Sequence, residues 1–237
     1  MSVTIQPLFF GFPGISDRGF LGWSSCVLLQ TGQRNILFDT CGYNERGELL
    51  KRLEKHQLIP ADVDAIILSH FHFDHAVNYR LFPNAKLYIH ELELEHARTN
   101  ATKDLAIPAE MLADMFATER VTELADEEGT CEGLSWRLAP GHTPGLVVLE
   151  LATDKGLTVL ASDAVKSLEA ITQDATLNTW NLAQTRKSIT IIQDRATRIL
   201  PGHDGWLIKD ATTGQFRRET PPSVTVQAQH TWHLKHS

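Results

Sequence analysis

The chain has 237 residues, 42% of them hydrophobic and 22% charged, which predicts one folded domain over residues 1–237 and excludes a disordered or collagen-like chain. Its 22 lysines and arginines face 29 aspartates and glutamates, and the net charge of −7 excludes general nucleic-acid affinity, which depends on cationic side chains that neutralise phosphates. The sequence has three cysteines without paired spacing, no apolar run of membrane-spanning length and no leader-like start. We therefore expect a reduced, cytoplasmic protein without a membrane partner.

The first half of the chain alternates between predicted strands and helices. Residues Gly11–Trp23 are rich in glycine and aromatic side chains, which indicates a hairpin or flap that covers a substrate. Leucines at spacings of three and four predict a helix over Glu45–Gln57. A second helix-prone stretch, Glu91–Phe116, is expected to break near Pro108, and its acidic start, Glu91–Glu95, is expected to face solvent. The predicted strands of this half are Val3–Phe10, Ser25–Gln30, Asn35–Asp39, Asp64–Leu68 and Lys86–His90.

The second half repeats this pattern with a group of strands and one long helix, Trp180–Asp194. The predicted strands are Leu134–Leu138, Leu146–Leu151, Leu157–Ala161, Arg198–Leu200 and Ser223–Gln229. Because strands outnumber helices and the helices separate groups of strands, we expect an α/β (α+β) fold in which two sheets pack together with helices outside.

Four side chains of types that commonly bind metals lie directly after the predicted strand that ends at Leu68. They are His70, His72, Asp74 and His75, in the pattern His-x-His-x-Asp-His. Neutral imidazole and carboxylate are typical zinc ligands. His70 and His72 lie two residues apart on an extended segment and therefore point the same way. Asp74 and His75 follow where the chain turns, and we expect them to face a second ion.

Further candidate ligands follow three other predicted strands. His142 and His203 each come after a Pro-Gly pair that stiffens the turn, and Asp163 follows the strand that ends at Ala161. Four strands therefore each deliver a ligand from a loop at one end, which is how the edge of a sheet builds a convergent site. The repeated Pro-Gly-His also indicates two related halves.

This ordered set resembles the metallo-β-lactamase-fold superfamily of hydrolases, whose signature is His-x-His-x-Asp-His followed by a lone His, a lone Asp and a lone His. The likeness extends from Asp39, where the family has an Asp in its first motif, to His203. It implies a four-layer αβ/βα sandwich of two mixed sheets. It also implies two metal ions, the first held by His70, His72 and His142, the second by Asp74, His75 and His203, with Asp163 bridging both.

The resemblance implies a mechanism as well. Two divalent ions, Zn²⁺ by expectation and Mn²⁺ or Fe²⁺ by ligand chemistry, would hold a bridging hydroxide that attacks a carbonyl or phosphoryl centre. Asp74 is the candidate catalytic residue, because its carboxylate can pass a proton on. We expect Asp39 to orient a ligating imidazole rather than to bind a metal itself.

Differences between this sequence and named branches of the family narrow the choice of subfamily. Asp163 argues against the classical β-lactamases, which lack a bridging Asp. Too few residues follow His203 for the helical domain of glyoxalase II, the acidic chain has no basic arm like that of RNase Z, and flavodiiron proteins carry a further flavodoxin domain. Compact lactonase-like and esterase-like hydrolases remain. Acyl-homoserine lactonases are similar in the Gly141–Gly145 turn, but they have His where this chain has Leu146 and Tyr where it has Lys166.

Two roles are open for Lys166. It can stabilise an oxyanion or bind a substrate carboxylate, or it can be an ordinary solvated side chain. Together with Phe20 and Trp23 of the flap it forms the set of candidate substrate contacts. The leading hypothesis is a dinuclear hydrolase of a small ester or lactone, with a small molecule as its partner. The alternatives are a phosphodiesterase acting on a small nucleotide, an iron-dependent thiol or persulfide dioxygenase, and a non-catalytic metal-dependent binder. Nothing in the sequence indicates the oligomeric state.

Overall fold

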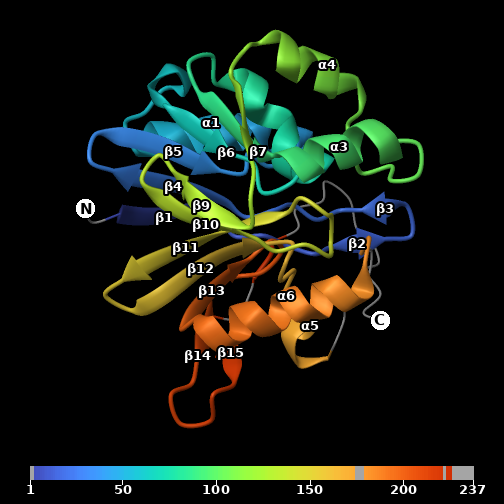
Figure 1. The fold of residues 1–237 in the computed structure, drawn as a ribbon. Coiled ribbons are helices and arrows are strands. Elements are labelled where there is room, and N and C mark those ends of the chain that lie inside the picture. The colour runs from blue at the N-terminus through green and yellow to red at the C-terminus, as the bar shows by residue number, and fades with distance from the viewer. Residues whose placement is uncertain (1–2, 174–178, 221–222, 226–237) are drawn as a thin grey trace.

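A computed structural model describes residues 3–173, 179–220 and 223–225, and within them two large β-sheets pack face to face (Figure 1). The first sheet has the strand order β1 (Val3–Phe9), β4 (Cys26–Thr31), β5 (Arg34–Phe38), β6 (Ala65–Ile67), β7 (Lys86–His90) and β8 (Val121–Leu124). The second has the order β15 (Phe216–Arg218), β14 (Leu207–Lys209), β13 (Arg198–Pro201), β12 (Gly156–Ser162), β11 (Val147–Thr153), β10 (Leu134–Leu138) and β9 (Glu128–Cys131). Both sheets mix parallel and antiparallel pairs.

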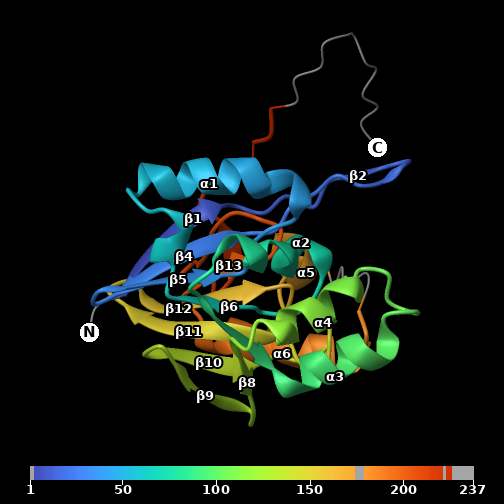
Figure 2. The ribbon, with the colours of Figure 1, turned by 90° about the horizontal axis from the view of Figure 1, so that it is seen from above.

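Helices cover the outer face of each sheet, which makes four layers. Helices α1 (Arg46–Lys55), α3 (Glu91–Asn100) and α4 (Glu110–Ala117) lie over the first sheet, and α5 (Leu168–Thr172) and α6 (Leu182–Arg195) lie under the second (Figures 1 and 2). The remaining elements are the one-turn helix α2 (Phe73–Ala76), the hairpin β2 (Ile15–Ser16) and β3 (Gly19–Phe20), and 3₁₀ turns at Tyr43–Glu45, Pro60–Asp62 and Val77–Leu81. No helix among the described residues has the length and apolarity needed to cross a bilayer.

Neighbouring residues of one strand pack into different cores, because successive side chains of a strand point to opposite faces. Leu28 of β4 lies in the core between the first sheet and its helices, whereas Leu29 lies in the core between the two sheets. In the second sheet, Leu149 of β11 shares that central core, and Val148 packs on the other side in a third core with Ile192 of α6. Three apolar layers therefore hold the four structural layers together.

The ends of parallel strands place the candidate ligands. Strands β5 and β6 are parallel neighbours in the first sheet, and β12 and β13 are parallel neighbours in the second. Asp39 directly follows β5, and the run that starts at His70 follows β6. Asp163 directly follows β12, and His203 comes two residues after β13. The carboxyl ends of these four strands thus deliver polar side chains to one edge of the sandwich.

Most predicted elements are confirmed, and β7 and β10 have the predicted bounds. The hairpin within Gly11–Trp23 is confirmed, with a bridge between Phe12 and Trp23. The helix-prone stretch Glu91–Phe116 divides into α3 and α4 with a gap wider than Pro108 alone predicts. Strands β8, β9, β14 and β15 were not predicted, because they have only three or four residues each and therefore little periodicity. The strand predicted at Ser223–Gln229 is wrong over residues 223–225, since β15 pairs with β14 instead, and its other residues lie outside the described ranges.

Replacing Leu149 by alanine is expected to lower the free energy of unfolding by about 2–5 kcal/mol, because the truncation leaves a cavity between the two sheets. Urea denaturation followed by circular dichroism measures this loss. Ile59→Ala is the control, because that side chain is 62% exposed and its loss should change stability by less than about 0.5 kcal/mol. Equal effects of the two substitutions would contradict the assignment of the central core.

Candidate metal centre

Seven buried side chains converge at the edge of the sandwich in overlapping groups. In each group the candidate ligand atoms lie within 4.8 Å of one another. The groups are His70, His72 and His142; His70, His75 and Asp163; and Asp74, His75 and His203. These are the seven residues that the sequence motif singles out, and they come from loops of both sheets.

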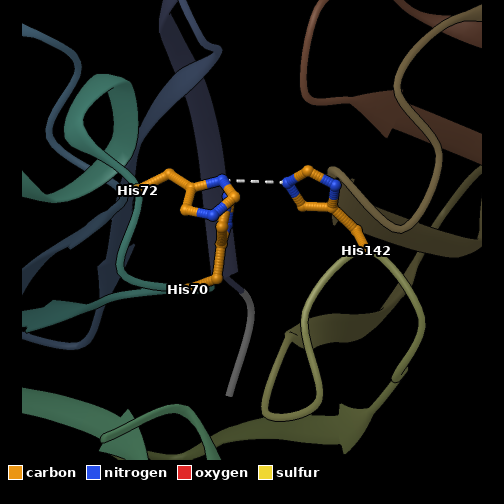
Figure 3. Close-up of side chains that lie close together, drawn as sticks. All are labelled: His70, His72 and His142. Carbon is orange, nitrogen blue, oxygen red and sulfur yellow. Dashed lines mark hydrogen bonds between the residues drawn. The ribbon is translucent and has the colours of Figure 1, made fainter. Parts of the chain in front are cut away.

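The first group consists of three imidazoles that face one another. Nδ1 of His72 lies 3.0 Å from Nε2 of His142, and the ring of His70 lies close to both (Figure 3). Nε2 of His70 is buried and makes no hydrogen bond to any described residue. Burial lowers the pKa of His70 well below its ordinary value, so this ring is neutral and keeps a lone pair. Neutral imidazole is the form that binds a metal.

Asp163 lies between the group of three imidazoles and the group of Asp74, His75 and His203. Its Oδ2 atom is 3.3 Å from Nε2 of His142, while Oδ1 is 3.3 Å from Nε2 of His75 and 3.2 Å from Nε2 of His203. Burial opposes the charge, but the facing His203 and Lys166 hold the pKa of the Asp163 carboxyl well below its usual range. One ionised carboxylate therefore contacts histidines on both sides.

The third group, Asp74, His75 and His203, has ring nitrogens that point at carboxylates. Nδ1 of His203 lies 3.0 Å from the backbone carbonyl of Trp23, which can only accept a hydrogen bond. That contact holds a ring proton on Nδ1 and directs Nε2 at the carboxylates, 3.5 Å from Oδ2 of Asp74. A lone pair facing carboxylate oxygens is repulsive unless a cation or a proton lies between them. The arrangement therefore calls for positive charge at this point.

Asp39 contacts His75 and lies outside the three ligand groups. Its carboxylate accepts hydrogen bonds from the backbone N–H of Ser69 at 2.7 Å and from the hydroxyls of Ser69 and Ser162, and Oδ2 lies 2.8 Å from Nδ1 of His75. Burial lowers the pKa of His75, but Asp74, Asp163 and Asp39 together outweigh it, and the net shift is well upward. Asp39 thus fixes the ring of His75 with Nε2 toward Asp163.

The donor set fits divalent cations. Nε2 of His70, Nε2 of His75 and Oδ1 of Asp163 are buried and lack a well-formed hydrogen bond within the described ranges. A polar atom buried without a partner costs about 1–3 kcal/mol. Imidazole nitrogen and carboxylate oxygen are the ligands that zinc, manganese and iron accept. Cations would satisfy these atoms and separate the facing lone pairs.

Glu93 lies beside the ligand loops, and its buried position differs from the solvent-facing one expected from the sequence. It belongs to the Glu91–Glu95 segment that was expected to face solvent, yet it is fully buried. Its Oε1 accepts a hydrogen bond from the backbone N–H of Phe71 at 2.9 Å, and Oε2 accepts one from Gly145 at 3.2 Å. Glu93 therefore joins the loop of His70 and His72 to the loop of His142. The sequence did carry one signal for this burial: Glu93 lies four residues before the apolar Ala97 and therefore shares a helix face with it.

A cavity of about 820 Å³ opens over the ligands. Apolar side chains from the flap and neighbouring loops form much of its wall, and its lining residues include Ile15, Phe20, Phe73, Leu105, Trp180, Lys103 and Lys166. The ring of Phe20 stands edge-on to His203, with ring centres 5.6 Å apart. The cavity therefore offers an apolar surface directly beside the ligand groups.

Lys166 and Phe20 line this cavity, but Trp23 does not lie among its described lining residues. Nζ of Lys166 lies 3.4 Å from Oδ2 of Asp163. The expectation that Trp23 contacts substrate stays a prediction; its ring packs on Phe12, and its Nε1 donates a hydrogen bond to the carbonyl of Phe10. Its backbone carbonyl, rather than its ring, contributes to the site by holding His203.

Comparison with known protein families gives one match across most of the chain. The model described as the metallo-beta-lactamase superfamily matches residues 21–203. The "probable metallo-hydrolase" of Methanocaldococcus jannaschii is 26% identical over 192 residues, which cover 77% of this chain and 88% of that protein. The N-acyl homoserine lactonase of Bacillus cereus is 30% identical over 165 residues, which cover 59% of this chain and 62% of the lactonase.

Solved structures share the architecture. A Thermotoga maritima protein assigned as a metallo-beta-lactamase superposes with a TM-score of 0.71 at 19% identity, covering 88% of this chain and 100% of the other. AidC, a dizinc quorum-quenching lactonase solved with a product, superposes with a TM-score of 0.67 at 24% identity, covering 88% of this chain and 82% of AidC. The four-layer sandwich expected from the sequence is confirmed.

Replacing Glu93 by alanine is expected to lower the free energy of unfolding by about 2–5 kcal/mol, because two buried N–H groups lose their acceptor. Glu93→Gln should lose less, since its amide keeps one acceptor oxygen. Urea denaturation of the metal-free protein provides the measurement. Glu91→Ala, on the exposed face of the same helix, is the matched control. The assignment of Glu93 fails if the two alanine variants are equally stable.

Proposed function

The chain belongs to the metallo-β-lactamase superfamily and is a metal-dependent hydrolase, and we propose that it uses two divalent cations to hydrolyse a small ester or lactone. The observation that carries the proposal is the position of Asp163. One of its carboxylate oxygens faces His142 of the first ligand group, and the other faces His75 of the third. Each group combines residues from both halves of the chain, which supports one catalytic domain.

The proposed ligands follow from the contacts. One cation would be held by His70, His72 and His142, the other by Asp74, His75 and His203, and Asp163 would serve both. Cations bound there supply Lewis-acid polarisation of a carbonyl oxygen and acidify a water molecule, whose pKa falls to about 7 on a catalytic zinc ion. Zinc is the proposed metal because of its preference for imidazole and carboxylate.

Asp74 is the proposed proton shuttle. Its side chain lines the cavity, and its contacts with His75 and His203 are both made by Oδ2. We assign Oδ1 to take a proton from the attacking water and to return it to the leaving group. A carboxylate in contact with the reacting atoms can perform both steps.

Lys166 is the proposed stabiliser of negative charge on the substrate. Its ammonium group lies beside Asp163 and lines the cavity, while its side chain is only 28% exposed. A fixed positive charge near the scissile carbonyl stabilises the oxyanion that forms in acyl transfer. Lys166 would thus occupy the role that Tyr has in the lactonases that the chain resembles.

The cavity supports a substrate with an apolar part. Phe20 and Phe73 lie edge to face, with ring centres 6.3 Å apart, next to the ligands. About 820 Å³ is a volume typical of small-molecule sites. The lactonase relative supports the inclusion of lactones among the candidate substrates.

A phosphodiester is the second candidate for the bond that is cleaved. The observation in its favour is that two lysines, Lys103 and Lys166, line the same cavity as the ligands. Their charges would suit an anionic phosphoryl group. The two candidates require the same cations and differ in the substrate alone.

The proposed function is tested by supplying zinc- or manganese-loaded protein with lactones, aryl esters, thioesters and bis-p-nitrophenyl phosphate. We expect turnover of an ester or lactone that chelation abolishes and that His72→Ala lowers by at least about 100-fold. Faster cleavage of the phosphodiester would favour the second candidate. Oxygen consumption with a thiol, or tight binding without any turnover above His72→Ala, would contradict hydrolysis of either bond.

Lys166→Met is expected to lower kcat by about 10²–10³-fold, the range found when one oxyanion donor is removed. Lys166→Arg should recover part of the loss, because it restores the positive charge. Steady-state kinetics with the best ester provide the measurement, and Lys155→Met, in an exposed turn, is the control. An unchanged kcat in Lys166→Met would remove Lys166 from the mechanism.

A further inference from the structure

The loop between α3 and α4 brings a carboxylate to the ligand His72. Oδ2 of Asp104 lies 2.9 Å from Nε2 of His72, and both side chains line the cavity. Asp104 is 32 positions away from His72 in the chain and belongs to no motif, so the sequence analysis did not single it out.

This contact determines how the His72 ring faces its neighbours. An ionised carboxylate only accepts hydrogen bonds, so Nε2 of His72 must carry the proton that is donated to Asp104. The other ring nitrogen, Nδ1, is then left with its lone pair toward Nε2 of His142, 3.0 Å away (Figure 3). Nδ1 is the atom that the proposed first cation would bind.

Asp104 is itself held in place by several contacts. Its Oδ1 atom accepts a hydrogen bond from the backbone N–H of Ala106 at 3.1 Å, and the carbonyl of Ala106 accepts one from Phe73 at 2.8 Å. This second bond ties the loop to the turn that carries Asp74. On the other side, Nε2 of His96 lies 3.7 Å from Oδ2 of Asp104. That nitrogen is buried and has no hydrogen-bond partner among the described residues, so Asp104 is the negative group it faces.

We propose that Asp104 is a positioning residue that sets the proton of His72 on Nε2 and aims Nδ1 at the first cation, with His96 supporting the carboxylate from behind. Asp39 holds His75 in the corresponding way, at 2.8 Å, on the other side of Asp163. Carboxylates that hold the second nitrogen of a ligating histidine typically change metal affinity by 10–100-fold. The inference rests on the proposed metal centre but assigns a residue that lies outside the three ligand groups.

Zinc affinity provides the first test. Competition with a chromophoric chelator measures both dissociation constants in the wild type, in Asp104→Ala and in Asp104→Asn. We expect Asp104→Ala to weaken one of the two by about 10–100-fold and to leave the other within twofold. Asp104→Asn, whose amide oxygen still accepts, should fall in between. Asp114→Ala is the matched control, because Asp114 binds Tyr79 and Arg80 away from the ligands and should leave both constants unchanged.

Long-range ¹H–¹⁵N NMR of the metal-free protein provides the second test, since it reports which nitrogen of His72 carries the proton. We expect Nε2–H in the wild type and in Asp104→Asn, and a mixture of tautomers in Asp104→Ala. A wild-type His72 protonated on Nδ1, or zinc constants of Asp104→Ala within twofold of wild type, would overturn the role of Asp104. A wild type that binds no zinc would refute the proposed function instead, while the tautomer of His72 would still decide the role of Asp104.

Discussion

The rest of the site depends on the contacts between the carboxylate of Asp163 and the histidines that surround it. Its Oδ2 atom faces His142, which follows β10 of the second sheet, and its Oδ1 atom faces His75, which follows β6 of the first sheet. Space for it exists because residue 202 is glycine, where a Cβ atom would lie 2.0 Å from Oδ1 of Asp163. Nε2 of His70, Nε2 of His75 and Oδ1 of Asp163 are buried here without a well-formed hydrogen bond within the described ranges, and these unsatisfied atoms are the physical reason for proposing two cations.

The fold meets this constraint with buried hydrogen bonds that span both sheets. Asp39 at the end of β5 accepts from Ser162 at the end of β12, and Glu93 of α3 joins the loop after β6 to the loop after β10. Burial keeps these bonds away from water, where each would be weaker. The ligand groups are therefore placed by the central packing of the sandwich, and the flap and the loop of Asp104 complete the cavity above them.

Two packed sheets with helices outside and the convergence of the seven candidate ligands could be predicted from the sequence, because the order of strands and helices, the short spacing of the ligands and their positions after strands carry that information, and the four layers followed from the resemblance to the family. Glu93 and Asp104 could not be predicted as easily. Each acts through a contact with residues far along the chain, and local composition makes both resemble solvated acidic residues. Aromatic content likewise indicates a flap, but not that the ring of Phe20 lines the cavity while the ring of Trp23 packs on Phe12.

We propose that this edge of the sandwich holds two cations that share Asp163. Crystals grown with zinc and measured at the zinc absorption edge test it most directly, because anomalous scattering locates each ion independently of the protein atoms. We expect two peaks on opposite sides of the Asp163 carboxylate, one among His70, His72 and His142 and one among Asp74, His75 and His203. A single peak, or peaks that lie away from Asp163, would contradict it.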